Sequence, residues 1–177
     1  MKKVATCLLL AFLINGAAHA QKGRNEVKLL AEGSTTLFDP HLGWGGFVKG
    51  YYGLGRSGQL TLTTGLIKFK SEIATGKSNT RTHLIPVLLG YKQHIGLFYI
   101  EPQAGLGEMG GRVDWGGDYS RPSATTVYAS LGAGVDIKKF EIGVRYQYAK
   151  GIDAATAGIW SNRKFELAAL HVGYKIF

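Results

Sequence analysis

The chain has 177 residues, with 26 glycines, four prolines and a formal net charge of +9, and its length suits a single domain. The lysines and arginines are scattered and form no stripe interleaved with aromatic residues, so the charge does not indicate binding of nucleic acid. Attraction to anionic lipid head groups or lipopolysaccharide explains the positive excess better. The single cysteine, Cys7, excludes a disulfide within the chain.

The first twenty residues have the pattern of a secretory signal peptide. Lys2 and Lys3 precede an apolar run from Val4 to Ile14, and Ala18-His19-Ala20 fits a small-residue cleavage site. The apolar run is too short for a spanning helix. We therefore expect a cleaved signal over 1–20 and one mature domain over 21–177.

The rest of the chain alternates apolar and polar residues with a period of two, which is typical of strands with one apolar face. The clearest example runs from Val127 to Ile137, where every odd-numbered residue is apolar. A tilted strand needs about 9–11 residues to cross a membrane. Eight such strands are predicted, over Glu26–Thr35, Gly45–Leu54, Gln59–Phe69, Thr82–Lys92, Leu97–Glu108, Thr125–Ile137, Phe140–Lys150 and Lys164–Phe177.

The connections between these strands alternate in length. Three are short turns, at 55–58, 93–96 and 138–139, and the other four, at 36–44, 70–81, 109–124 and 151–163, are longer. This rhythm predicts an eight-stranded antiparallel up-and-down transmembrane β-barrel, with short turns facing the periplasm and long loops facing outward. Pro86 and Pro102 interrupt two of the strands, and we expect a β-bulge to absorb each, because proline cannot donate to a ladder.

The polar faces of the strands would fill the barrel interior, which is too narrow for an aqueous channel when eight strands close. Glu101 and Arg145 lie at similar distances from their turns, and we expect them to pair directly or through one water, since an unpaired buried charge is costly. The alternative role is a path for protons or ions. The expected structural network consists of Lys49, Tyr99, Glu101, Gln103, Tyr128, Arg145 and Gln147.

Three segments resemble a known family: His83 to Lys92 with its Ile-Pro-aliphatic-aliphatic pattern, Leu131 to Ile137, and Phe140 to Tyr146. They are similar to the small outer-membrane β-barrels of Bacteroidetes, which are eight-stranded barrels of the OmpA/OmpX type. The resemblance implies location in the bacterial outer membrane, no catalytic residues and no cofactor. It also implies contact with outer-membrane lipids, with lipopolysaccharide and, during insertion, with the assembly machinery.

Two motifs allow other interpretations. Gly105 to Gly110 matches the dinucleotide fingerprint G-x-G-x-x-G, but that motif needs a following helix, and close packing of a strand followed by a flexible, glycine-rich loop is expected here instead. His83, with Ser71 and Glu72 in the preceding loop, would allow a Ser/His/acid set of an acyl hydrolase. His171 faces inward by its parity, and packing or solvation is the expected role of each histidine.

We therefore expect a monomeric outer-membrane barrel that is not an open pore and not an enzyme, with a structural or interaction role through its extracellular loops. Those loops would contact a protein or another surface ligand. Two alternatives remain open. One is an outer-membrane enzyme that removes acyl chains from lipid A or phospholipid. The other is a periplasmic lipocalin-like binder, which would need an apolar interior and a polar exterior.

Overall fold

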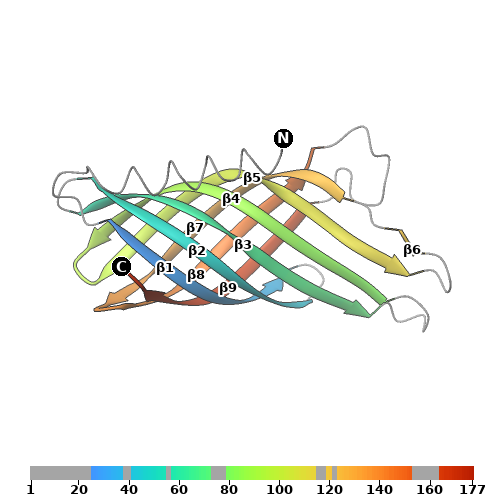
Figure 1. Cartoon of the computed structure of the whole chain (residues 1–177), viewed down its shortest axis with the longest axis horizontal. Coiled ribbons are helices and arrows are strands. Elements are labelled where there is room, and N and C mark those ends of the chain that lie inside the picture. The colour runs from blue at the N-terminus through green and yellow to red at the C-terminus, as the bar shows by residue number, and fades with distance from the viewer. Residues whose placement is uncertain are drawn as a thin grey trace.

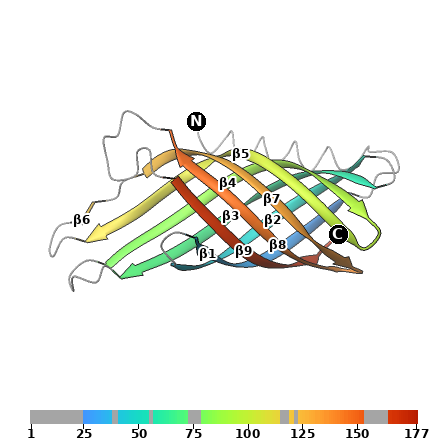
Figure 2. The same cartoon turned by 180° about the vertical axis from the view of Figure 1, so that it is seen from behind.

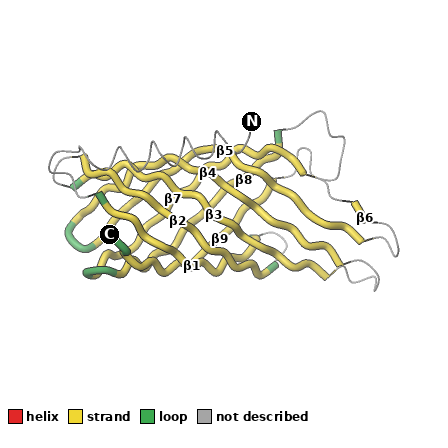
Figure 3. The backbone as a smooth tube through the Cα atoms, viewed as in Figure 1, coloured by secondary structure: helices red, strands yellow, loops and turns green. Residues whose placement is uncertain are grey.

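The computed structural model describes residues 25–37, 41–54, 57–72, 79–114, 119–120, 123–152 and 164–177, so the predicted signal peptide lies outside the described residues. These ranges form strands joined by turns and contain no helix long and apolar enough to cross a bilayer (Figure 3). The strands are β1 (Glu26–Thr36), β2 (Leu42–Leu54), β3 (Gly58–Glu72), β4 (Asn79–Ile95), β5 (Phe98–Asp114), β6 (Tyr119–Ser120), β7 (Ser123–Ile137), β8 (Phe140–Gly151) and β9 (Lys164–Lys175).

Eight of the strands close into one antiparallel barrel (Figures 1 and 2). Each pairs with its neighbours along the chain, and β1 pairs with β9 to close the sheet. The ninth strand, β6, has two residues and pairs with the far end of β5. The predicted eight-stranded up-and-down barrel is therefore confirmed, and β6 is an addition within the long connection before β7.

The register fixes how steeply the strands climb around the barrel. Starting at Glu26, successive Cα partners are Tyr51, Thr61, Gly90, Gln103, Ser130, Gln147, Leu167 and finally Thr36. One circuit thus returns to β1 ten residues beyond its start, at residue 36 instead of residue 26. With a rise of about 3.3 Å per residue and about 4.8 Å between strands, this shear tilts the strands by about 40° to the barrel axis.

Alternate residues of each strand face the interior and the outside, as the period of two predicts. In the middle of the wall, Leu131 is 56% exposed and Val144 is 58% exposed, whereas their neighbours Ser130 and Arg145 are buried. The outer surface is therefore apolar where a membrane would surround it. A lipocalin-like binder would need the opposite arrangement, with a polar exterior, so that alternative is wrong.

The two ends of the barrel differ as predicted, although the strands are longer than expected. The short turns lie at one end, where Gly96 and Lys138 take positive φ angles of 67° and 56°; the C-terminus lies at the same end (Figure 1). At the other end β3 continues to Glu72 and β5 to Asp114. The glycine motif at 105–110 therefore lies within a strand, not before a loop.

The two prolines within strands cause no bulge. The partners of β3 and β4 stop at Thr64 with Val87 and resume at Ile67 with Leu84, so two pairs are missing around Pro86 and the register is unchanged. The ladder of β4 with β5 is likewise interrupted opposite Pro102 and then continues in register. The expected bulges are therefore wrong, because a missing donor interrupts the ladder locally without requiring an extra residue.

Candidate functional site

The interior of the barrel is the candidate site, because its filling decides whether an ion or a molecule can pass from one end of the barrel to the other. Two sets of side chains fill it. The part near the short turns is a set of buried ions and hydrogen-bonded side chains, called here the lumen network. The part near the long loops is a cluster of apolar side chains, called here the apolar plug. Strand parity directs both sets inward.

Glu141 on β8 is the centre of the lumen network. Its side chain is fully buried, and three ammonium groups, two hydroxyls and one imidazole surround its two carboxylate oxygens. These contacts are Lys28 Nζ at 2.8 Å, Lys92 Nζ at 2.8 Å, Lys49 Nζ at 3.3 Å, Tyr51 OH at 2.5 Å, Tyr99 OH at 3.1 Å and His171 Nε2 at 3.3 Å. Glu141 therefore depends on donors from six other positions.

Asp136 extends this network towards the mouth at the short-turn end. Its carboxylate lies 2.6 Å from Lys28 Nζ and 2.6 Å from Lys92 Nζ, so both lysines bridge Asp136 and Glu141. The imidazole Nε2 of His94 is 2.8 Å from Asp136 Oδ2, the oxygen that Lys92 also contacts. The side chains of Asp136 and His94 are partly exposed, and they mark the solvent edge of the network.

Above Glu141, the next ion pair joins Glu101 to Lys49. Gln103 connects this pair with the next level: its amide nitrogen donates to Glu101 Oε1 at 3.0 Å and to Thr63 Oγ1 at 2.9 Å. Its amide oxygen accepts from Ser130 Oγ at 3.1 Å. Because the amide of Gln103 both donates and accepts, one side chain satisfies groups on three strands.

Arg145 pairs with Glu32, a buried residue of β1. Gln147 donates to the other oxygen of Glu32 at 3.0 Å, and Arg145 also donates to Gln103 Oε1 at 3.4 Å. The expected ion pair between Glu101 and Arg145 is therefore wrong, because Gln103 lies between them. The sequence-based network omitted Glu32, Glu141, Lys28, Lys92 and His171.

The apolar plug closes the other half of the interior. Its members come from all eight long strands and are nearly or fully inaccessible: Leu30, Phe47, Ile67, Phe69, Leu84, Met109, Ala124 and Leu167 in one cluster, and Leu88, Tyr128 and Ala149 in a second, with Phe165 packed against both. The guanidinium of Arg145 lies 4.8 Å from the centre of the Phe47 ring and joins network to plug.

Tyr128 is the one predicted network residue that the plug contains. Its hydroxyl has no hydrogen-bond partner among the described residues, and it packs with Leu88 and Ala149. The other six predicted residues, Lys49, Tyr99, Glu101, Gln103, Arg145 and Gln147, are buried and hydrogen-bonded within the lumen network.

The charges of the lumen network balance one another. Its three lysines and one arginine (Lys28, Lys49, Lys92 and Arg145) match its four carboxylates (Glu32, Glu101, Asp136 and Glu141) in number. A neutral set of paired ions can be buried, whereas an excess charge could not without a further partner. The lumen network and the apolar plug together make the described interior a packed core that separates the two ends of the barrel.

The arrangement offers no catalytic set in the described ranges. His171 contacts Tyr99 at 2.9 Å and Glu141 inside the barrel, away from the outer face where an acyl hydrolase would act on lipid. His83 has Lys68 as its Cα partner on β3, and the side chains of Ser71 and Glu72, which the acyl-hydrolase alternative would need, lie outside the part that the structure describes. No group of three or more His, Cys, Asp or Glu residues is placed to hold a metal ion within the described chain.

The glycine motif at 105–110 has a packing role. An added Cβ at Gly105 would collide with the backbone carbonyl of Val87, and one at Gly107 with that of Ile85. Both glycines thus let β5 lie close to β4. Since β5 continues as a strand to Asp114, no helix follows to hold a pyrophosphate, and the dinucleotide interpretation is excluded.

The sequence matches no family model and no curated protein, but solved structures are similar. Ail, the attachment invasion locus protein of Yersinia pestis, has a TM-score of 0.65 and 15% identity over 88% of this chain and 100% of that chain. Ail bound to the heparin analogue sucrose octasulfate has a TM-score of 0.62 at 14% identity, with the same shares covered.

Two further structures extend the likeness. The N-terminal β-barrel domain of Pseudomonas aeruginosa OprF has a TM-score of 0.62 and 14% identity over 88% of this chain and 100% of that chain. Neisserial surface protein A has a TM-score of 0.58 and 14% identity over 86% of this chain and 97% of that chain. The chain therefore has the closed eight-stranded fold that these bacterial surface and outer-membrane barrels share.

Proposed function

We propose that this protein is an outer-membrane barrel that does not conduct and that acts through the loops at its long-loop end. The observation that carries the proposal is the filled interior: the lumen network and the apolar plug together occupy both halves. A protein of this build has no passage to offer. Its variable connections are then the parts available for contact with a partner.

The outer surface supports the location. The outward residues of the strands are predominantly apolar, and the barrel has no free sheet edge because β1 pairs with β9. Both properties are needed in a bilayer, where unpaired backbone groups are costly. Export by the signal peptide, insertion by the outer-membrane assembly machinery and a monomeric state belong to this proposal, as does orientation of the long loops towards the cell exterior.

The long-loop end also presents a raised platform. The three adjoining strands β3, β4 and β5 have 15, 17 and 17 residues, whereas β1, β8 and β9 have 11, 12 and 12. The sheet therefore extends further on one side and carries the connections at 73–78 and 115–118. We propose that this side contacts a protein or a polyanion; Ail, which binds a heparin analogue, is a similar barrel.

Two measurements test the proposal. A tag inserted near Gly76 or Gly117 is expected to be labelled on intact cells, and labelling only after permeabilisation would reverse the orientation. The full chain, reconstituted in planar bilayers, is expected to give no stable conductance. Large and reproducible conductance steps would show that the interior is an open pore.

A further inference from the structure

Buried polar atoms that lack a hydrogen-bond partner are concentrated around one residue of the lumen network, Glu32. Among the described residues, seven buried side-chain atoms have no such partner, and four of the seven surround this carboxylate: Ser34 Oγ, Arg145 Nε, Gln147 Oε1 and His171 Nδ1. The side chains that carry them are more than nine-tenths buried. Because buried polar groups in native proteins are almost always hydrogen-bonded, four at one place indicate a bound partner.

The strand register brings these atoms together. His171 on β9 is the Cα partner of Glu32 on β1, and Ser34 is the next inward residue of β1. Arg145 and Gln147 reach Glu32 from β8, the first as its ion-pair partner and the second by a hydrogen bond of 3.0 Å. The four atoms therefore belong to β8, β9 and β1 and border one place beside the seam at which β9 and β1 close the barrel.

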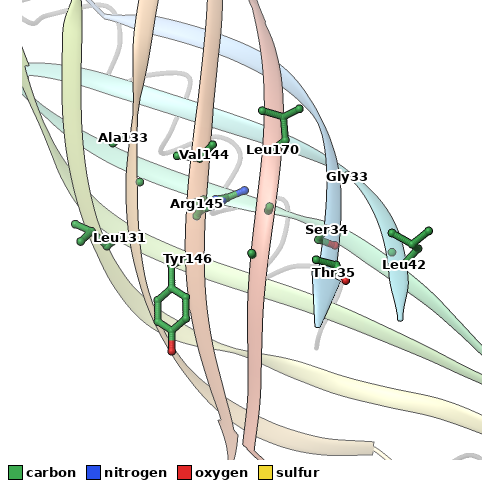
Figure 4. A pocket seen from close by; sticks show the side chains of 14 residues that line it. Gly33, Ser34, Thr35, Leu42, Leu131, Ala133, Val144, Arg145, Tyr146 and Leu170 are labelled. Carbon is green, nitrogen blue, oxygen red and sulfur yellow. The ribbon is translucent and has the colours of Figure 1, made fainter. Parts of the chain in front are cut away.

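A small side chain leaves room at this place. Ala169 on β9 is the Cα partner of both Arg145 and Ser34 and stands between them. The side chain of Arg145 extends from β8 towards β9, and Ser34 lies beyond β9 on β1 (Figure 4). These three residues line the pocket shown there, most of which is a groove on the outer wall. Inside the barrel, only a methyl group stands on the line from Arg145 to Ser34.

The hydrogen-bonding capacities of the four atoms fit water. Arg145 Nε–H can only donate, Gln147 Oε1 can only accept, and the hydroxyl of Ser34 can do both. His171 Nε2 lies 3.3 Å from Glu141 Oε1, which can only accept, so the ring proton is on Nε2 and Nδ1 accepts. Water donates two hydrogen bonds and accepts two, and a buried water molecule typically makes about three.

The charges of the lumen network select a neutral ligand. Its lysines and arginine already match its carboxylates in number. A bound ion, or a second proton on the ring of His171, would add a charge without a counter-charge to a closed interior, which is costly. Water adds none, and it supplies both the donors and the acceptor that the four atoms need.

We propose that the barrel holds a buried water site beside Glu32, between β8, β9 and β1. Water at this site accepts from Arg145 Nε–H, donates to Gln147 Oε1 and His171 Nδ1, and has Ser34 as a further partner. It connects the ion pair of Glu32 and Arg145 with the centre of the lumen network through His171. The site goes beyond the proposed function, because it concerns how the closing strands are joined and holds whichever way the barrel inserts.

The apolar plug offers a matched place that should stay dry. The hydroxyl of Tyr128 also lacks a partner among the described residues, but it packs with Leu88 and Ala149. A water molecule needs two to four polar partners, and no second unpartnered atom belongs to the plug as the structure describes it. Ala149→Val is therefore the control for Ala169→Val, since both changes add two methyl groups to an inward-facing alanine.

Nuclear magnetic resonance of the isotope-labelled full chain in detergent micelles tests the site. Magnetisation transfer from water to Arg145 Nε–H should give a direct cross-peak, which Ala149→Val should keep and Ala169→Val should abolish. Ser34→Ala should keep it too, because three partners remain. A wild-type barrel without the cross-peak would overturn the proposal, as would a cross-peak that survives in Ala169→Val. Loss of the cross-peak in Ser34→Ala would also overturn it, since the signal would then come from the serine hydroxyl.

Two further measurements separate the site from folding and from protonation. Heat-modifiable migration in gels shows whether each variant is a folded barrel. A valine variant that does not fold is replaced by Ala169→Ser, whose hydroxyl takes the place of the water and should abolish the cross-peak, or by Ala149→Ser, which should keep it. The nitrogen chemical shifts of the His171 ring should show a neutral imidazole with its proton on Nε2. A proton on Nδ1 would remove an acceptor of the site and contradict the assignment.

Discussion

The lumen half at the short-turn end is held by ion pairs, whereas the half at the long-loop end is held by apolar contacts. In the lumen network each charged group depends on particular partners: Lys28 on β1 contacts Glu141 on β8 at 2.8 Å. In the plug, Leu84 and Met109 are fully buried but need only neighbours of suitable shape. The stability of the first half therefore depends on the register of the strands, and that of the second half depends on the volume of its side chains.

This difference between the two halves explains how the barrel closes in a single register. Two contacts of the network, Lys28 with Glu141 and Arg145 with Glu32, join β1 to β8 across the closing strand β9. A shift of β1 by one residue would turn its whole inward set outward, and a shift by two would separate these ions. Apolar side chains would tolerate such a shift better, so we infer that the ion pairs specify the closure.

The largest expected effect is the loss of the network's centre. Glu141→Gln keeps the shape of the side chain but leaves Lys28, Lys49 and Lys92 with one carboxylate fewer, so we expect a loss of about 3–5 kcal/mol in the free energy of unfolding. Urea unfolding in detergent measures it. Glu108→Gln, on the exposed face of β5, is the control and should change stability by about 0.5 kcal/mol or less. Equal effects would show that Glu141 is not the centre.

The plug should respond to lost volume instead of lost charge. Leu84→Ala removes a fully buried side chain and should cost about 2–5 kcal/mol, because the cavity is closed on all sides. Leu89→Ala, on the same strand but 57% exposed, should cost less, since lipid or detergent can fill the space. The same unfolding measurement compares them. A larger loss of stability for Leu89→Ala than for Leu84→Ala would mean that the assignment of Leu84 to the interior and Leu89 to the outer surface is wrong.

Both halves depend on the same assignment of faces, which a charge on the outer wall tests. Leu131→Arg places a guanidinium at the middle of the membrane-facing surface and should cost about 2–4 kcal/mol in a lipid bilayer. Lys68→Arg, on the outer face near the long-loop end, keeps its charge and serves as the control. Folding yield into vesicles and unfolding in urea measure both. Equal tolerance of the two changes would contradict the parity of β7.

Much of the fold could be predicted from the sequence, because strand faces and loop lengths are local properties. The period of two placed Leu131 and Val144 outside and Arg145 inside. The length of β5 was underestimated, since Gly110 and Gly111 look like the start of a loop but continue the strand that pairs with β4. The plug was missed in part because the inward residues Leu84 and Leu88 lie in β4, a strand whose middle is apolar on both faces.

The pairing of charges could not be predicted, because it depends on the shear of the barrel. Glu101, Gly132 and Arg145 lie on one line across the strands. That line climbs as it passes from β5 to β8, by about 6 Å over two strands with the usual spacing and tilt. Arg145 therefore lies higher than Glu101 and meets Glu32 of β1. Counting residues from each turn ignored this climb.

The smallest expected effect separates the true ion pair from the apparent one. In a double-mutant cycle, Glu32→Gln and Arg145→Met should show a coupling of about 0.5–3 kcal/mol, because the two charges are in contact and each is left unpaired when the other is removed. The cycle of Glu101→Gln with Arg145→Met should be nearly additive, within about 0.5 kcal/mol, since Gln103 lies between them. Urea unfolding of the three single variants and the two double variants supplies both coupling energies. A stronger coupling of Arg145 to Glu101 than to Glu32 would contradict this assignment. It would mean that residues at equal distances from their turns pair with each other, whatever the tilt of the strands.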